Sequence, residues 1–175
     1  MCIRDSLKTQ KIVGTSMVIS KSLATKVGFA ELHCLSNYSF LSGASHPEEL
    51  VEAAAQKGYR AIALTDECTY SGLVKAHIAA KKHAIKFIVG SEFRVSFGTP
   101  INEKLVLLAP NRSAYGQLAA FISKLRMKSE KGSYFAQIDD FRIGLNQCFV
   151  LWVPSLNSIS VLTQRGEQLK TMFSE

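Results

Sequence analysis

The chain has 175 residues, of which 47% are hydrophobic and 20% are charged. That length supports one domain with a real core, and the composition excludes a chain that is disordered throughout. The formal net charge of +7 suggests a polyanionic partner, but residues 1–28 alone carry a net charge of +4. The rest of the chain is only mildly basic, so charge by itself is a weak indication of nucleic-acid binding.

The four cysteines, at positions 2, 34, 68 and 148, show no Cys-x-x-Cys spacing. This distribution favours neither a zinc ribbon nor a disulfide framework, and it predicts a reducing, cytoplasmic location. No apolar run approaches the roughly 20 residues that cross a bilayer, so we expect no membrane contact. Residues 1–28 are basic and lack a clear period, which indicates a poorly ordered N-terminal extension before a domain at 29–175.

From Phe29 onward the hydrophobic pattern predicts alternating strands and helices. We expect strands at 29–35, 61–64, 86–95, 104–109 and 148–153, and helices at 47–57, 71–84, 112–126 and 161–175. Strands and helices in alternation favour parallel pairing through right-handed crossovers, which defines an α/β fold. The apolar face of the helix at 71–84 is expected to comprise Leu73, Val74, Ile78 and Ala80, with His77 near it.

The strand at 61–64 is an uninterrupted apolar run that is followed by Asp66 and Glu67. Open α/β sheets and barrels bind ligands beyond the carboxyl ends of their strands, so these carboxylates are candidates for a functional site. Asp is also common at turns, and Asp66 would then only cap the turn before the helix that begins near Gly72. The sequence leaves both interpretations open.

Two further strand ends carry residues of related chemistry. His33 lies near the end of the first strand, and Glu92 lies in or just after the third. With Asp66 and Glu67 they offer the imidazole and carboxylate ligands that bind zinc, manganese or iron at hydrolytic centres. The alternative is that His33 is a packed or hydrogen-bonded core residue. Lys104 begins a strand, and we interpret it as a solvated edge residue.

Four segments, at 31–45, 63–68, 88–93 and 105–115, resemble successive motifs of the PHP domain, the polymerase and histidinol phosphatase family. The motifs are His-Cys-Leu-Ser-Asn-Tyr-Ser-Phe-Leu from His33, Thr-Asp-Glu-Cys from Thr65 and Gly-Ser-Glu-Phe from Gly90. They are similar to the PHP domain at the N-terminus of bacterial DNA polymerase III alpha subunits, and most of all to its error-prone, damage-inducible paralogue. The resemblance implies a PHP-type distorted β/α barrel, a seven-stranded relative of the TIM barrel, truncated at the C-terminus.

The chain departs from the metal-competent members of that family at two positions. Leu35 stands where they have the second His of His-x-His, and Glu67 stands where they have the His of Thr-Asp-His. Glu92 falls on the family's metal-binding acid. Because Leu35 offers no ligand atom, the resemblance implies a degenerate metal site at His33, Asp66, Glu67 and Glu92, where zinc or manganese is doubtful.

The resemblance also implies a function for the whole protein. The chain would be the N-terminal PHP fragment of a DNA-directed DNA polymerase in damage-induced mutagenesis and translesion synthesis, with the PHP part a structural scaffold. Primer-template DNA, dNTPs and possible further mutagenesis proteins would be its partners, and magnesium would bind in a palm domain outside this chain. No catalytic residue is expected in the fragment. Two alternatives remain: a metal-dependent phosphoesterase or 3′-5′ proofreading nuclease, and a non-catalytic interaction module.

Overall fold

The computed structural model describes residues 28–98, 102–142, 144–155 and 158–173. Its elements are, in order, β1 Ala30–Cys34, α1 Pro47–Gln56, β2 Ala61–Leu64, α2 Leu73–Lys82, β3 Lys86–Ser96, β4 Asn102–Ala109, α3 Arg112–Met127, β5 Ala136–Gln137, the 3-10 helix η2 Ile138–Arg142, β6 Phe149–Val153 and α4 Ile159–Phe173. The predicted strands and helices are confirmed in type and order, with bounds that differ by a few residues. The predicted extension at 1–28 lies outside the described residues except for Gly28.

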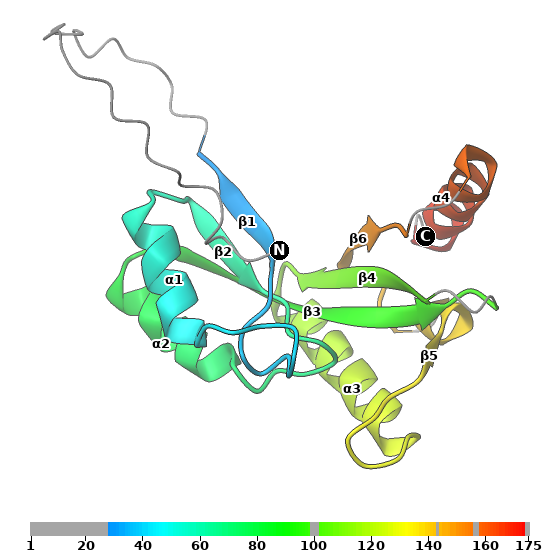
Figure 1. Ribbon diagram of the computed structural model, residues 1–175, viewed down its shortest axis with the longest axis horizontal. Coiled ribbons are helices and arrows are strands. Elements are labelled where there is room, and N and C mark those ends of the chain that lie inside the picture. Colours follow the sequence, from blue (N-terminus) through cyan, green and yellow to red (C-terminus); the bar gives the residue numbers. More distant parts are fainter. Residues whose placement is uncertain (1–27, 99–101, 143, 156–157, 174–175) are drawn as a thin grey trace, which may run out of the picture.

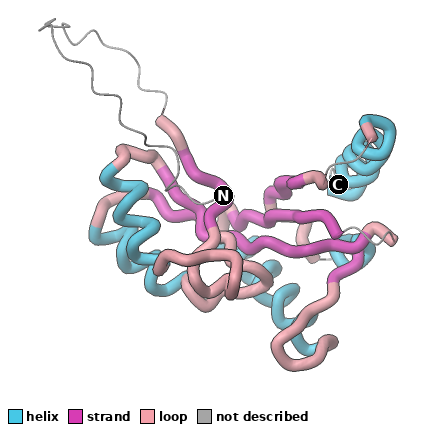
Figure 2. Tube along the Cα trace, viewed as in Figure 1, coloured by secondary structure: helices cyan, strands magenta, loops and turns pink. Residues whose placement is uncertain are grey.

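The six strands form one mixed sheet in the order β1-β2-β3-β4-β6, with the short β5 paired to the far end of β3. Strands β1, β2 and β3 are parallel, as the intervening helices predicted. The pairs β3–β4 and β4–β6 are antiparallel. The sheet is curled (Figures 1 and 2), and within the described residues β1 and β6 form its two separate ends. The fold is therefore mixed α/β with an open, curled sheet.

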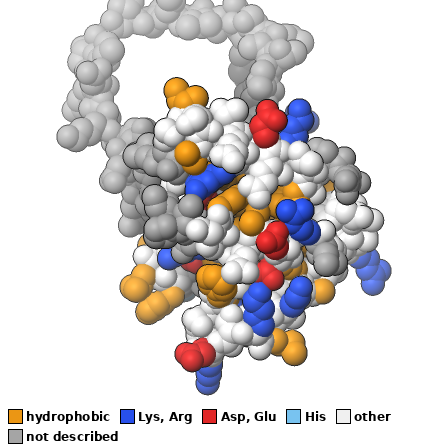
Figure 3. Space-filling view, turned by 90° about the vertical axis from the view of Figure 1, so that its right-hand side faces the viewer, with side chains coloured by type: hydrophobic (Ala, Val, Ile, Leu, Met, Phe, Trp, Pro, Cys, Tyr) orange, Lys and Arg blue, Asp and Glu red, His pale blue; other side chains and the backbone are white. Residues whose placement is uncertain are grey.

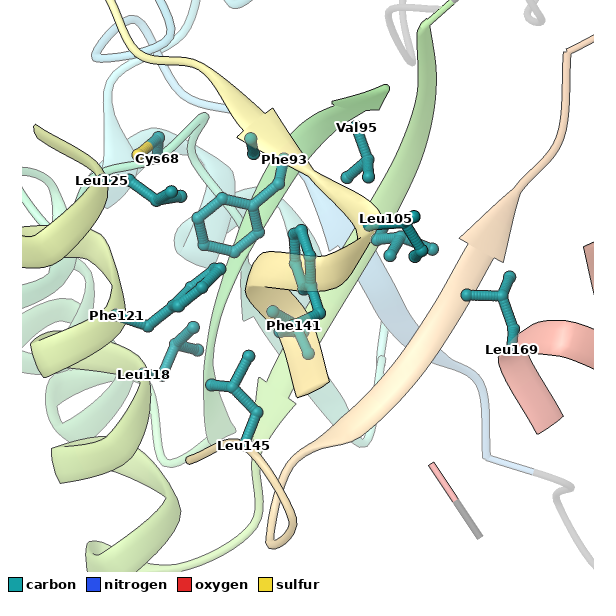
Figure 4. Close-up of a cluster of buried hydrophobic side chains, with 13 residues drawn as sticks. Cys68, Phe93, Val95, Leu105, Leu118, Phe121, Leu125, Phe141, Leu145 and Leu169 are labelled. Atoms are coloured by element: carbon teal, nitrogen blue, oxygen red, sulfur yellow. The ribbon is translucent and has the colours of Figure 1, made fainter. Parts of the chain in front are cut away.

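The helices cover different parts of this sheet. Helices α1 and α2 lie together against the parallel strands, and α3 lies beside the β3–β4 hairpin (Figure 1). The larger core cluster lies between α3 and the hairpin, where Phe93, Phe121 and Phe141 meet with ring centroids 4.8 to 5.7 Å apart (Figure 4). Such edge-to-face and tilted contacts stabilise aromatic clusters beyond simple burial. They fix the position of β3, which carries Glu92 of the candidate site.

Helix α2 buries Ala80, as its apolar pattern predicted, but turns Val74 and Ile78 away from the core. Its buried residues are Ala76, Ala79 and Ala80, whereas Val74 and Ile78 are 65% and 63% exposed. The predicted position of His77 near a buried face is also wrong, because His77 is exposed. The three alanines have small side chains that allow α1 and α2 to pack closely, and larger residues would hold the helices apart.

Helix α4 is attached to the sheet through a buried carboxylate on β4. Glu103 is 1% exposed, and the Arg165 guanidinium of α4 pairs with it. The indole N–H of Trp152, on β6, donates a hydrogen bond to the other oxygen of Glu103. Leu169 adds an apolar contact with the larger core cluster. One acidic side chain thus connects β4, β6 and α4.

Candidate functional site

Asp66 follows β2, which is buried at all four of its positions. The Asp66 side chain is 2% exposed, and its Oδ1 accepts hydrogen bonds from the Ser36 amide and the Ser39 hydroxyl, both at 2.7 Å. Its Oδ2 accepts the Ser36 hydroxyl, also at 2.7 Å. Of the two interpretations of Asp66, the cap before α2 is wrong, because the N-cap of that helix is Gly72 without a side-chain cap bond. Asp66 instead closes the loop at 35–46, between β1 and α1.

Ser36 and Ser39, which the sequence analysis did not single out, are the partners that define the role of Asp66. The Ser39 hydroxyl also accepts a hydrogen bond from the Glu67 amide at 2.9 Å, which ties the loop to the end of β2 a second time. The loop folds back tightly on itself, since a Cβ at Gly43 would lie 2.0 Å from the Ser36 carbonyl oxygen. A serine-rich loop next to a buried aspartate was the available signal for this arrangement.

Glu92 lies in β3 and is 1% exposed. Its Oε2 is 2.6 Å from Nε2 of His33, and its Oε1 is 2.9 Å from the Lys104 ammonium. Burial alone would raise the pKa of Glu92, but the hydrogen bonds from His33 and Lys104 and the positive charge of Lys104 outweigh it, so the pKa is lowered. Glu92 is therefore an ionised carboxylate at neutral pH. Of the four predicted residues, only His33 and Glu92 contact each other through their side chains.

The backbone of Glu67 pairs with that of Glu92 in an isolated parallel β-bridge. The carboxylate of Glu67 binds other groups. Arg94 contacts both of its oxygens, with Nε at 3.0 Å and a terminal nitrogen at 3.1 Å. The Tyr134 hydroxyl donates to the same carboxylate at 2.8 Å and accepts the Arg94 amide at 2.7 Å. Burial raises the pKa of Tyr134, and the adjacent Glu67 charge raises it further, so the phenol remains a donor.

Lys104 is not the solvated edge residue that the sequence suggested. Its side chain is 40% exposed, yet the ammonium lies against Glu92. The hairpin register explains the contact: Glu92 is opposite Val106 and Arg94 is opposite Lys104, so Lys104 is the diagonal neighbour of Glu92 on one face. This register is the signal that could have identified Lys104 from the sequence.

The arrangement does not fit a divalent metal ion. Within the part of the chain that the structure describes, no group of three or more His, Cys, Asp or Glu side chains is placed to hold one. Both oxygens of Asp66 already accept hydrogen bonds, and the gap beside it, lined in part by Tyr70 and Gly90, has no room for a water molecule. The adjacent Cys68 is fully buried, and burial raises the pKa of its thiol to about 11. We derive no metal-dependent step from these residues.

The surface charge on the face that Figure 3 shows is mixed. Lysine and arginine side chains alternate with acidic ones rather than gathering in a single basic patch. Several basic residues are in ion pairs, among them Arg94 with Glu67 and Lys128 with Asp140. The described residues on this face therefore form no continuous basic track for a nucleic-acid backbone.

The PHP domain family matches residues 31–151, which include every residue of the candidate site. This match covers more than half of the chain, and the chain therefore belongs to the PHP domain family. None of the helices in the described ranges is long and apolar enough to cross a membrane.

The chain is also similar to proteins called error-prone DNA polymerase. It is 51% identical over 150 residues to the protein of Dechloromonas aromatica, covering 83% of this chain and 14% of that one. It is 49% identical over 157 residues to the protein of Idiomarina loihiensis, covering 90% of this chain and 14% of the relative. The chain thus spans about one seventh of the length of these relatives.

Among solved structures, the chain is similar to an amidohydrolase from Chromobacterium violaceum. The likeness has a TM-score of 0.47 and 33% sequence identity, and it covers 56% of this chain and 33% of that protein. A structure from Bifidobacterium adolescentis, described provisionally as a metal-dependent phosphoesterase, gives a TM-score of 0.48 at 20% identity and covers 58% of this chain and 34% of that protein.

Proposed function

We propose that this chain is the N-terminal PHP region of an error-prone DNA polymerase, and that the region supports the polymerase structurally. The observation that carries the proposal is the identity of about half of all positions, over 150 residues, with relatives of that name. The site geometry supports the scaffold role, because each of its three carboxylates is bound by groups of the protein itself.

In this proposal the curled sheet is part of a PHP-type seven-stranded barrel. Primer-template DNA, dNTPs and the catalytic magnesium ions would be bound by other regions of the polymerase. Damage-induced mutagenesis and translesion synthesis would be the cellular role, in the cytoplasm. No residue of this chain is assigned to nucleotidyl transfer.

The test uses the complete gene product and its H33A/E92Q variant, which removes the one contacting pair among the predicted ligands. We expect primer extension within about twofold of the wild type, because the changed groups support structure and bind no substrate. The variant should melt at a lower temperature, since it breaks a buried hydrogen-bonded pair.

Release of 3′ nucleotides is measured in parallel with manganese or zinc present. Metal-dependent trimming by the wild type that is lost in H33A/E92Q would replace the scaffold proposal with the nuclease alternative. The single variant H33A, whose histidine is one-third exposed, serves as a milder form of the same test.

A further inference from the structure

Four charged side chains share one face around the β3–β4 hairpin. Glu92 and Arg94 are two residues apart on β3, so they point to the same side of the sheet. Lys104 is the cross-strand partner of Arg94 on β4, and Glu67 is bridged to Glu92 from the end of β2. The hairpin register and the β2–β3 bridge together place two carboxylates and two cations in one cluster.

Each carboxylate of this cluster is paired with one of the two cations, and Glu92 also contacts His33 at 2.6 Å. Glu92 binds Lys104 at 2.9 Å, and Glu67 binds Arg94 at 3.0 Å. Two negative and two positive charges give the four side chains a net charge of zero. The carboxylates are the buried members, at 1% and 16% exposure, whereas the two cations are 40% and 52% exposed. A buried carboxylate is destabilising unless hydrogen-bond donors or a cation compensate its charge, and at Glu67 and Glu92 a cation does so.

We propose that Lys104 and Arg94 are the resident cations of this site and that they replace a divalent metal ion. They supply the positive charge that Glu67 and Glu92 require, from side chains fixed by the β3–β4 register. A divalent ion placed here would add two positive charges next to two existing ones, and would have to break both ion pairs to reach the carboxylates. The site is therefore stable without metal and has little affinity for one.

The first measurement is metal content and metal response of the full wild-type chain. After dialysis, we expect less than about 0.1 zinc or manganese per chain by mass spectrometry. A chelator, or added zinc or manganese, should leave hydrogen exchange in β3 and β4 unchanged, because ligands that bind the native state selectively would slow it. Stoichiometric metal whose removal speeds exchange in these strands would overturn the proposal.

The second measurement is hydrogen exchange in K104M, with K86M as the matched control. Lys86 is an exposed lysine at the start of β3, the strand that pairs with the strand of Lys104. We expect K104M to speed exchange in β3 and β4 by about tenfold or more, because Glu92 loses the ammonium that neutralises its charge. K86M should match the wild type. Equal protection in K104M and K86M would overturn the proposal.

The double variant K104M/E92Q keeps the test decisive if K104M folds poorly. Removing the carboxylate charge together with the ammonium should restore much of the lost protection, since no unpaired buried charge remains. A double variant that is no better than K104M would show that Lys104 acts by packing alone, and would overturn the proposal.

The inference concerns the site to which the proposed function gives a structural role. Its measurements involve no DNA, so its failure is distinguishable from a failure in primer extension.

Discussion

The segment after β2 and the middle of β3 each hold a buried carboxylate, by two different means. Among the described residues, the donors to Asp66, after β2, are neutral: one backbone amide and two serine hydroxyls. Glu92, in β3, is bound by a histidine and a lysine ammonium. Both side chains are almost completely buried, at 2% and 1% exposure. Similar burial has therefore been compensated once by hydrogen bonds and once by charge.

The difference follows from where the partners lie in the sequence. The donors to Asp66 belong to one loop, so the bonds shape that loop and connect it to the end of β2. The partners of Glu92 lie on β1 and β4, so its bonds join the parallel part of the sheet to the antiparallel hairpin. Asp66 is thus a local anchor, and Glu92 connects distant parts of the chain.

Changing Asp66 to Ala should have the largest effect on stability. D66A leaves three buried donors, from Ser36 and Ser39, without an acceptor, and we expect a loss of about 3 to 5 kcal/mol in the free energy of unfolding. Chemical denaturation measures the change. The control is S42A at an exposed serine of the same loop, for which we expect less than about 0.5 kcal/mol. A D66A protein as stable as S42A would mean that the loop does not depend on this carboxylate.

Changing Tyr134 to Phe should have an intermediate effect on stability, since it removes one hydroxyl that contacts the Glu67–Arg94 ion pair. The hydroxyl donates to Glu67 and accepts the Arg94 amide, so Y134F should cost about 1 to 2 kcal/mol. Y38F is the matched control, because Tyr38 is 39% exposed and its ring still faces Lys75 after the change. If thermal denaturation shows equal losses for both variants, the hydroxyl of Tyr134 does not stabilise the cluster.

Protonation of Glu92 should change the free energy of unfolding least. Burial disfavours the ionised carboxylate and so offsets part of its stabilisation by His33 and Lys104. Its pKa in the folded chain is lowered from the ordinary 4.5, so the unfolded chain binds the proton more readily. The stabilisation is complete above that ordinary pKa and is lost as pH falls through the folded pKa. We therefore expect the stability difference between wild type and E92Q to shrink below about pH 4.5 in denaturation series from pH 7 to 3. If the stability difference stays constant with pH, it arises from the shape and hydrogen bonds of the Glu92 side chain and not from its charge.

The sequence was sufficient to predict strands β1 to β4 and β6 and helices α1 to α4, but not β5 or η2. It also named His33, Asp66, Glu67 and Glu92 as candidates, although Glu92 lies within β3 rather than at its end. Apolar runs with punctuated ends determine these features locally, and β2 is the clearest case. The partners of those residues were not predictable in the same way. Asp66 depends on how the loop at 35–46 folds over β2, and Lys104 depends on the β3–β4 register rather than on its own neighbours. The face of α2 was mispredicted because close packing of small alanines outweighed the burial of Val74 and Ile78.

The buried contact between Glu103 and Arg165 also provides an optical reporter. Trp152 is the only tryptophan in the sequence, and its indole N–H donates to the same carboxylate that holds α4. Indole emission responds to the polarity and hydrogen bonding around the ring, so release of α4 from Glu103 would change the fluorescence of this chain. The attachment of one helix can therefore be followed by intrinsic fluorescence, without a label and without altering any residue.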